Sequence, residues 1–159
     1  MIISEENIEY HNKMMSEALK LAVKSLRNYD VPVGAVVVSD GIIIGRGYNR
    51  IEKSNNPINH AETAAINQAV KKYGHKHLLN CDIYITLEPC SMCAGAIVLS
   101  RIKRVFIGAD DPKTGAGGSV FNILSDLRLN HRCDVMRGVM EKECSELLKN
   151  FFKDLRKRK

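Results

Sequence analysis

The sequence predicts an α/β protein in which helices cover both faces of a mixed five-stranded sheet, giving a three-layer α/β/α sandwich. Three observations lead to this class: five short β-rich segments, helical patterns between and around them, and a strand, a helix and a strand in succession that imply a parallel crossover. The 159 residues, 45% of them hydrophobic, suffice for one core. We therefore expect a single domain spanning residues 1–159.

The first third of the chain is expected to form a helix and a β-hairpin. Apolar residues recur at helical spacing, with charges between them, over residues 5–26, which predicts an amphipathic helix. Two β-branched runs follow at 33–38 and 42–47, and the short Gly-containing turn between them predicts a hairpin. Gly45 and Gly47 weaken the second strand and indicate that some other group approaches its backbone closely.

The middle of the chain alternates helices and strands. A polar loop at 53–57 has no apolar periodicity, and a helix is expected over 60–73. A buried strand at 82–87, a helix at 91–100 and a strand at 104–109 then form the expected parallel crossover.

The last third is expected to combine a Gly-rich loop with one strand and a long helix. The loop covers 110–119 (DDPKTGAGGS) and a short helix follows near 120–127. A strand is expected near 134–139, and a final helix begins at about Glu141.

The formal net charge of +6 favours a polyanionic partner, although an ordinary solvated surface can give the same value. Much of the positive charge gathers at the C-terminus, where Phe151 and Phe152 precede the cation-rich segment 153–159. Stacking and phosphate attraction are typical of single-stranded RNA binding, but the phenylalanines could equally dock on the core. No secretory signal or membrane-length apolar stretch is apparent, so we expect a cytoplasmic protein without membrane association.

Two short motifs, HAE at 60–62 and PCSMC at 89–93, carry residues suited to metal chemistry. Each motif is expected to open a helix, where unpaired backbone N–H groups and the helix dipole favour thiolates over thiols. A CxxC pair alone would also suit a redox centre, but together with the upstream HxE it predicts zinc bound by His60, Cys90 and Cys93. The remaining cysteines are interpreted as core or surface thiols: Cys81, Cys133 and Cys144.

Three protein ligands leave the fourth tetrahedral position open for water, as catalytic zinc sites require. A closed structural site would need a fourth ligand, which His75, His77 or Cys81 could supply. Zinc makes hydroxide available near neutral pH, and Glu62 could take the proton of the water, pass it to a ring nitrogen and protonate the leaving ammonia. The pairing of HxE with PCxxC is the known signature of zinc deaminases that act on nucleobases.

Six segments, spread over nearly the whole chain, carry a resemblance to a known family: VPVGA (31–35), YNR (48–50), HAE (60–62), LEPCSMCAG (87–95), DDPKTGAGGS (110–119) and NHR (130–132). With these segments the chain resembles the bacterial tRNA-specific adenosine deaminases, which convert the wobble adenosine of an anticodon to inosine. The Gly-rich loop and the NHR that follows it are the features most specific to that family. The resemblance implies a cytidine deaminase-like fold.

The resemblance also implies roles for residues outside the two motifs. Asn49 would hydrogen-bond the flipped nucleotide, and Val33 and Leu87 would line the base pocket. Asp111 and Lys113 would contact neighbouring nucleotides of the anticodon loop. From the residues alone, Asn49 could instead cap a turn, Val33 and Leu87 could be core, and Asp111 could simply start a loop.

The resemblance implies one zinc ion per subunit and a homodimer that binds the tRNA anticodon stem-loop, with the basic C-terminal helix reaching the stem. We expect no organic cofactor. Asp110 departs from some relatives, which have a basic residue at that position.

The expected reaction is hydrolytic deamination of adenosine to inosine at the wobble position, with zinc-bound hydroxide attacking C6 of the flipped adenine and Glu62 as proton shuttle. Unpaired anticodon bases cost little to splay into such a pocket. One alternative is a deaminase of a free base or nucleoside, of guanine or cytosine type. Another is a non-catalytic RNA-binding or structural zinc domain, in which Glu62 would have no role.

Overall fold

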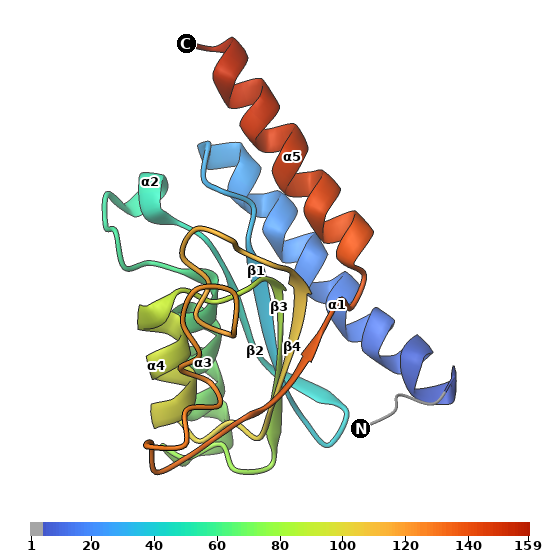
Figure 1. Cartoon of the computed structure of the whole chain (residues 1–159), viewed down its shortest axis with the longest axis vertical. Coiled ribbons are helices and arrows are strands. Elements are labelled where there is room, and N and C mark those ends of the chain that lie inside the picture. The colour runs from blue at the N-terminus through green and yellow to red at the C-terminus, as the bar shows by residue number, and fades with distance from the viewer. Residues whose placement is uncertain (1–4) are drawn as a thin grey trace.

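The computed structural model describes residues 5–159 and has three layers (Figure 1). Helices α1 and α5 lie side by side on one face of the sheet, and α3 and α4 cover the other, which confirms the predicted α/β/α class with a mixed five-stranded sheet. In chain order the elements are α1 (Glu5–Ser25), the 3-10 helix η1 (Leu26–Asn28), β1 (Gly34–Ser39), β2 (Ile42–Tyr48), α2 (Ile51–Ser54), α3 (Ala61–Tyr73), β3 (Cys81–Leu87), α4 (Ser91–Leu99), β4 (Arg104–Ala109), β5 (Asp134–Arg137) and α5 (Glu141–Lys157).

The strands lie in the order β2-β1-β3-β4-β5. β1 is antiparallel to both β2 and β3, so the predicted hairpin is confirmed. β3, β4 and β5 run parallel to one another, and α4 makes the expected crossover between β3 and β4. Because β3 and β4 are parallel, the segments after their carboxyl ends meet at the same end of the sheet.

The core has two layers because successive strand residues point to opposite faces. Val36 of β1 and Tyr84 of β3 pack on the side of α1 and α5, where Tyr84 stacks on Phe106 with ring centroids 4.4 Å apart. Val37 and Ile83, their neighbours along the strands, pack on the side of α3 and α4. Because of this alternation, the sheet presents apolar side chains to α1 and α5 on one face and to α3 and α4 on the other.

The backbone of β2 is in direct contact with α3. A Cβ atom placed on Gly47 would lie 2.0 Å from the carbonyl oxygen of Ala61, and one on Gly45 would lie 2.2 Å from that of Ala65. The expected close approach at these two glycines is therefore confirmed. The contact holds the first turn of α3 on the strand with no side chain between them.

The prediction of a short helix near 120–127 is wrong. The segment consists of turns and an isolated bridge between Gly117 and Asn122, and the amide of Gly118 donates to the carbonyl of Phe121. Its apolar residues do not form one buried face, because Leu124 is buried whereas Leu127 is 79% exposed. Hydrogen bonds to the preceding Gly-rich loop, such as those from the amides of Val120 and Phe121 to the carbonyl of Gly115, therefore hold this segment in turns.

Two smaller differences concern element ends. The last strand stops at Arg137 rather than near residue 139, because Gly138 follows with a positive φ of 80°. The short helix α2 was not expected, and its end overlaps the start of the polar loop expected at 53–57. The buried Asp30 carboxylate accepts a hydrogen bond from the amide of Glu52 in the first turn of α2. No helix within residues 5–159 combines the length and the apolar character needed to cross a membrane.

Replacing Gly47 with alanine is expected to lower the free energy of unfolding by at least about 2 kcal/mol, because the added Cβ overlaps the backbone of α3. Chemical denaturation of both proteins measures the loss. Gly95→Ala is the matched control, since a Cβ at Gly95 in α4 meets no atom within 4 Å and alanine favours a helix. A Gly47→Ala protein as stable as the parent would contradict the close packing of α3 on β2.

Candidate metal centre

The residues of the two motifs lie at two helix starts. His60 immediately precedes α3 in an extended conformation (φ −86°, ψ 157°), and Cys90 immediately precedes α4 in a similar one (φ −70°, ψ 174°). Glu62 and Cys93 follow in the first turns of the same helices. Both helix starts carry backbone N–H groups without helical partners, which makes this place electropositive and favours thiolates and carboxylates.

Three side chains converge at this place as a metal site requires. The Nδ1 atom of His60 lies 3.7 Å from Sγ of Cys90 and 3.5 Å from Sγ of Cys93, and all three atoms lie within 4.8 Å of one another. Tetrahedral zinc with ordinary bond lengths separates a nitrogen and a sulfur ligand by about 3.6 Å. The three atoms are therefore spaced as zinc ligands, with Nδ1 as the donor atom of His60.

The residues that could have closed the site lie elsewhere. Cys81 begins β3, whereas Cys90 follows its other end, and a strand of this length spans roughly 20 Å. His75 and His77 follow the far end of α3, which begins at the metal centre. Within residues 5–159 the cluster therefore has three candidate protein ligands, which leaves one position of a tetrahedral site for a group from outside the chain.

The two cysteines are electrostatically different. Hydrogen bonds from Cys93 and then from His60 outweigh the effect of burial and lower the pKa of Cys90 to about 4. The hydrogen bond with Cys90 in turn raises the pKa of His60 and of Cys93, and burial adds to the rise for Cys93. The lowered pKa of Cys90 favours the thiolate, which is the form of cysteine that binds a metal cation.

Glu62 is buried beside this cluster with one carboxylate oxygen unpaired. The residue is 3% exposed, and within residues 5–159 its Oε2 has no hydrogen-bond partner. Burial raises the pKa of Glu62 to about 7. An unpaired buried oxygen is costly, so its presence next to three candidate ligands indicates a place built for a group that comes from outside the chain.

Asn49 joins the strand layer to the start of α3. Its side-chain Oδ1 accepts a hydrogen bond from the backbone amide of Ala61 at 2.9 Å. Its backbone amide donates a hydrogen bond to the carbonyl of Val33 at 3.1 Å. The side chain thus bonds the first amide of α3 rather than capping a turn of its own, and its NH₂ group remains for a further contact. Val33 is buried in the core layer of α3 and α4, where Leu87 packs at its border.

A cavity of about 670 Å³ opens between the Gly-rich loop and α5, and it brings together Leu87, Asp111 and Lys113. Its cationic wall is formed by Lys113, Lys149 and Arg156, and Phe152 adds an aromatic ring. Val33 and Asn49 do not line this cavity. The expected contact residues therefore fall into two groups, one beside the metal centre and one in the cavity.

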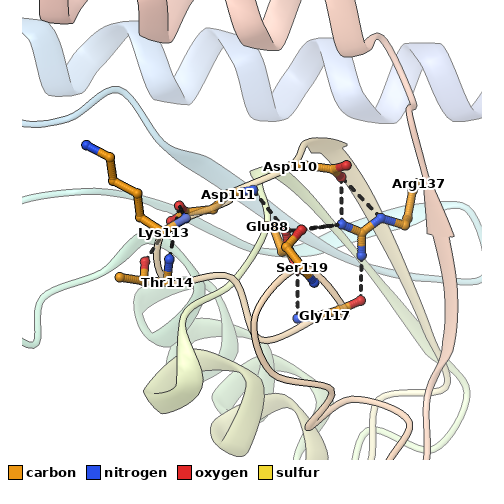
Figure 2. Close-up of polar contacts among 8 residues, drawn as sticks. All are labelled: Glu88, Asp110, Asp111, Lys113, Thr114, Gly117, Ser119 and Arg137. Atoms are coloured by element: carbon orange, nitrogen blue, oxygen red, sulfur yellow. Dashed lines mark hydrogen bonds and ion pairs between the residues drawn. The ribbon is translucent and has the colours of Figure 1, made fainter.

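The Asp111 side chain is engaged within its own turn. Its Oδ1 accepts the amides of Lys113 and Thr114 at 3.0 and 3.2 Å, and its Oδ2 accepts the hydroxyl of Thr114 at 2.7 Å. Figure 2 shows the Lys113 side chain extending away from this turn. The loop-forming role considered for Asp111 is present, and the side chain that projects from the turn is Lys113.

Sequence reasoning missed a second polar cluster, centred on the buried Glu88 (Figure 2). Its carboxylate accepts the amides of Asp111, Gly117 and Ser119 at 2.9, 3.0 and 2.9 Å, and Arg137 of β5 lies 3.1 Å away. Burial alone would raise the pKa of Glu88, but the hydrogen bond from the Ser119 hydroxyl, the amides of Asp111 and Ser119, and the charge of Arg137 lower it below its ordinary value. The sequence signal was an acidic residue between a buried strand and a ligand motif.

Comparison with known sequences places these features among the deaminases. The family model of the MafB19-like deaminases matches residues 9–156. A tRNA-specific adenosine deaminase of Streptococcus pyogenes is 46% identical over 153 residues, which cover 96% of each chain. The tRNA-specific adenosine deaminase of Bacillus subtilis is 47% identical over 145 residues, covering 91% of this chain and 90% of the relative.

Solved structures agree with the sequence relatives. A structure from biochemical and structural studies of A-to-I editing by tRNA:A34 deaminases at the wobble position of transfer RNA matches with a TM-score of 0.81 and 42% identity, covering 86% of this chain and 99% of that one. A guanine deaminase from Bacillus subtilis matches with a TM-score of 0.61 and 39% identity over 70% of each chain. The first match confirms the expected cytidine deaminase-like fold.

Replacing Cys93 with serine is expected to abolish stoichiometric zinc binding, because the hydroxyl stays protonated where a thiolate is needed. Metal analysis of protein purified with zinc measures the content per chain. Cys133→Ser is the matched control, since Cys133 is also a buried thiol but lies outside the cluster. Equal zinc contents in the two variants would contradict the assignment of the metal centre.

Proposed function

The chain belongs to the tRNA-specific adenosine deaminases, and from this premise we propose that it converts the wobble adenosine of a tRNA anticodon to inosine by hydrolytic deamination. The observation that carries the proposal is the unpaired, buried carboxylate of Glu62 beside three side chains spaced as zinc ligands. A binding domain would have no use for such a group. The reaction needs one, because a proton must move from water to the purine ring and the leaving amine.

We propose zinc as the metal, one ion per chain, held by Nδ1 of His60 and the sulfurs of Cys90 and Cys93. Two thiolates and an imidazole are a donor set that suits zinc, and the three atoms have the spacing of a tetrahedral site. Bound zinc would supply a Lewis acid that lowers the pKa of a water molecule.

Glu62 is proposed as the proton carrier. Its pKa of about 7 lets the carboxylate accept a proton and give it up again near neutral pH. It would take the proton of the attacking water, deliver it to the ring nitrogen beside C6, and later protonate the leaving amine. The burial of Glu62 excludes bulk water and so keeps the proton within the site.

Recognition of the RNA is proposed to use both groups of contact residues. The free NH₂ group of Asn49 can donate to the flipped nucleoside beside Val33, and Leu87, which borders the same core cluster and also lines the cavity, would add a second apolar wall. The cavity beside α5 has room for an unpaired neighbouring nucleotide, and Lys113 with the other cations of its wall can neutralise phosphates. Asp111 would contribute by shaping the turn that carries Lys113.

We also propose that the chain forms one domain, works in the cytoplasm and pairs as a homodimer. The proposed contact lies where α3 and α4 end, away from the metal centre. Leu99 there is 79% exposed and Leu79 52% exposed, and the hydrogen bond from the Leu78 amide to the Ser100 carbonyl brings these two segments together. Large exposed apolar side chains gathered at one place favour a protein partner.

Each of the two alternative functions leaves a feature of the structure unexplained. A deaminase of a free base would use the same metal centre, but it would have no need of a cavity lined by Lys113, Lys149 and Arg156 outside that centre. A non-catalytic zinc domain would leave the unpaired oxygen of Glu62 without a purpose.

Replacing Glu62 with glutamine is expected to lower the single-turnover rate by at least about 10³-fold, since it removes the proton carrier and keeps the shape of the side chain. The substrate is an anticodon stem-loop with adenosine at the wobble position, and inosine is the product measured. Zinc content and stem-loop binding are expected to stay at the level of the parent protein.

Controls separate the substrates. A stem-loop with cytidine at the wobble position, free adenosine and free guanine are tested alongside. Turnover of a free base or nucleoside without turnover of the stem-loop would overturn the substrate assignment. A Glu62→Gln protein with full activity would overturn the mechanism.

Replacing Leu99 with glutamate is expected to convert a dimer into a monomer, because a charge would be buried at the centre of the contact. Sedimentation velocity of the parent and the variant measures the masses. Val23→Glu is the control, because Val23 is also an exposed apolar residue, 50% exposed, but lies on α1 at the opposite face of the sheet. A parent protein that sediments as a monomer would contradict the dimer.

A further inference from the structure

The Glu88 cluster connects three separate parts of the chain. Glu88 lies between β3 and the ligand Cys90, its bonding partners lie in the Gly-rich loop, and Arg137 lies on the edge strand β5. Two backbone bonds run beside it, from the Glu88 amide to the Ala109 carbonyl and from the Ala116 amide to the Pro89 carbonyl, each 2.8 Å long. The segment that leads to the metal centre and the Gly-rich loop therefore form one bonded unit.

The Arg137 side chain forms hydrogen bonds to several parts of this unit. Its Nη2 lies 2.7 Å from Asp110, 2.9 Å from the Ser119 hydroxyl and 3.1 Å from Glu88, and its Nη1 donates to the carbonyl of Gly117. Figure 2 shows the planar guanidinium group reaching these partners on several sides. A lysine has one nitrogen and cannot bond all of them at once.

The loop has no room for displacement on the inner side. A Cβ on Gly115 would lie 2.4 Å from the carboxyl carbon of Glu88, so the loop backbone rests directly on that carboxylate. The Asp111 amide is bonded to Glu88, and the Asp111 side chain closes the turn from which Lys113 projects. The place of Lys113 in the cavity wall thus depends on Glu88 through a short series of hydrogen bonds.

We propose that Glu88 and Arg137 are positioning residues that hold the Lys113 turn in place for RNA, an inference that rests on the proposed function. Neither residue is needed as a direct contact. The Glu88 side chain has no exposed surface, and the donors of Arg137 are directed at Glu88, Asp110, Ser119 and Gly117. The positive charge of Arg137 is also balanced by two carboxylates, which leaves little of it for a phosphate.

The test combines Arg137→Met with Lys113→Ala in a double-mutant cycle. Single-turnover deamination of the wobble-adenosine stem-loop gives a half-saturating RNA concentration and a maximal rate for each protein. Arg137→Met is expected to raise the half-saturating concentration on the order of tenfold, with a maximal rate within about threefold of the parent, because binding is weakened and the metal centre is kept. In the Lys113→Ala background the same change is expected to have little further effect.

Each other result overturns the proposal. Additive effects of the two substitutions would make Arg137 a direct RNA contact. A half-saturating concentration that does not change would leave Arg137 without a role in binding. Loss of zinc together with the maximal rate would make the cluster a support of the metal centre instead.

Two further measurements keep the proposal testable if Arg137→Met folds poorly or if the stem-loop is not a substrate. Arg137→Lys retains the positive charge but has one nitrogen in place of the planar guanidinium group. Its half-saturating RNA concentration is expected to lie between those of the parent and Arg137→Met. Hydrogen exchange at the amides of Asp111, Gly117 and Ser119 is expected to be faster in Arg137→Lys than in the parent. The control is Lys103→Met, at the opposite end of β4, in which exchange at these amides is expected to match that of the parent. Unaltered exchange in Arg137→Lys would overturn the positioning role, whereas a parent protein inactive on the stem-loop contradicts the proposed function alone.

Discussion

The contact between α3 and the backbone of β2 is the packing constraint on which the candidate metal centre depends. Gly45 and Gly47 let the helix lie on the strand without intervening side chains, and Ala61 and Ala65 are small enough to complete the contact. Metal ligands must be placed to within a few tenths of an ångström, and a helix held by backbone contact has little freedom to shift. The contact of α3 with β2 therefore determines where His60 and Glu62 lie, together with the helix that carries them.

Two buried glutamates near the centre have opposite surroundings. Glu88 receives hydrogen bonds from the Gly-rich loop and a cation from Arg137, and its pKa is lowered despite burial. Glu62 keeps an unpaired oxygen, and burial raises its pKa. The surroundings thus favour the charged form of Glu88 and the protonated form of Glu62, because the chain donates several hydrogen bonds to one carboxylate and leaves an oxygen of the other unpaired within residues 5–159.

The sequence predicted the features that depend on local pattern. The strands, most helices and the three-residue metal cluster were anticipated, since HxE and PCxxC each lie within one helix start and needed only to be brought together. The segment 120–127 was wrong, because its conformation depends on contacts with Gly115 and Gly117 rather than on its own spacing. Glu88 and Arg137 were missed for a related reason: they are 49 residues apart, and no periodicity connects a loop to an edge strand.

The candidate centre and the cavity come from different stretches of the chain, joined at Glu88. The candidate ligands, Glu62 and Asn49 all lie between residues 49 and 93, whereas most of the cavity wall lies between residues 109 and 156. In the proposed function, substitutions in the last third would change which molecule the cavity holds and leave the candidate metal centre as it is. In evolutionary terms, a chain organised in this way can diversify its substrates by divergence of one end and inherit its reaction unchanged through the other.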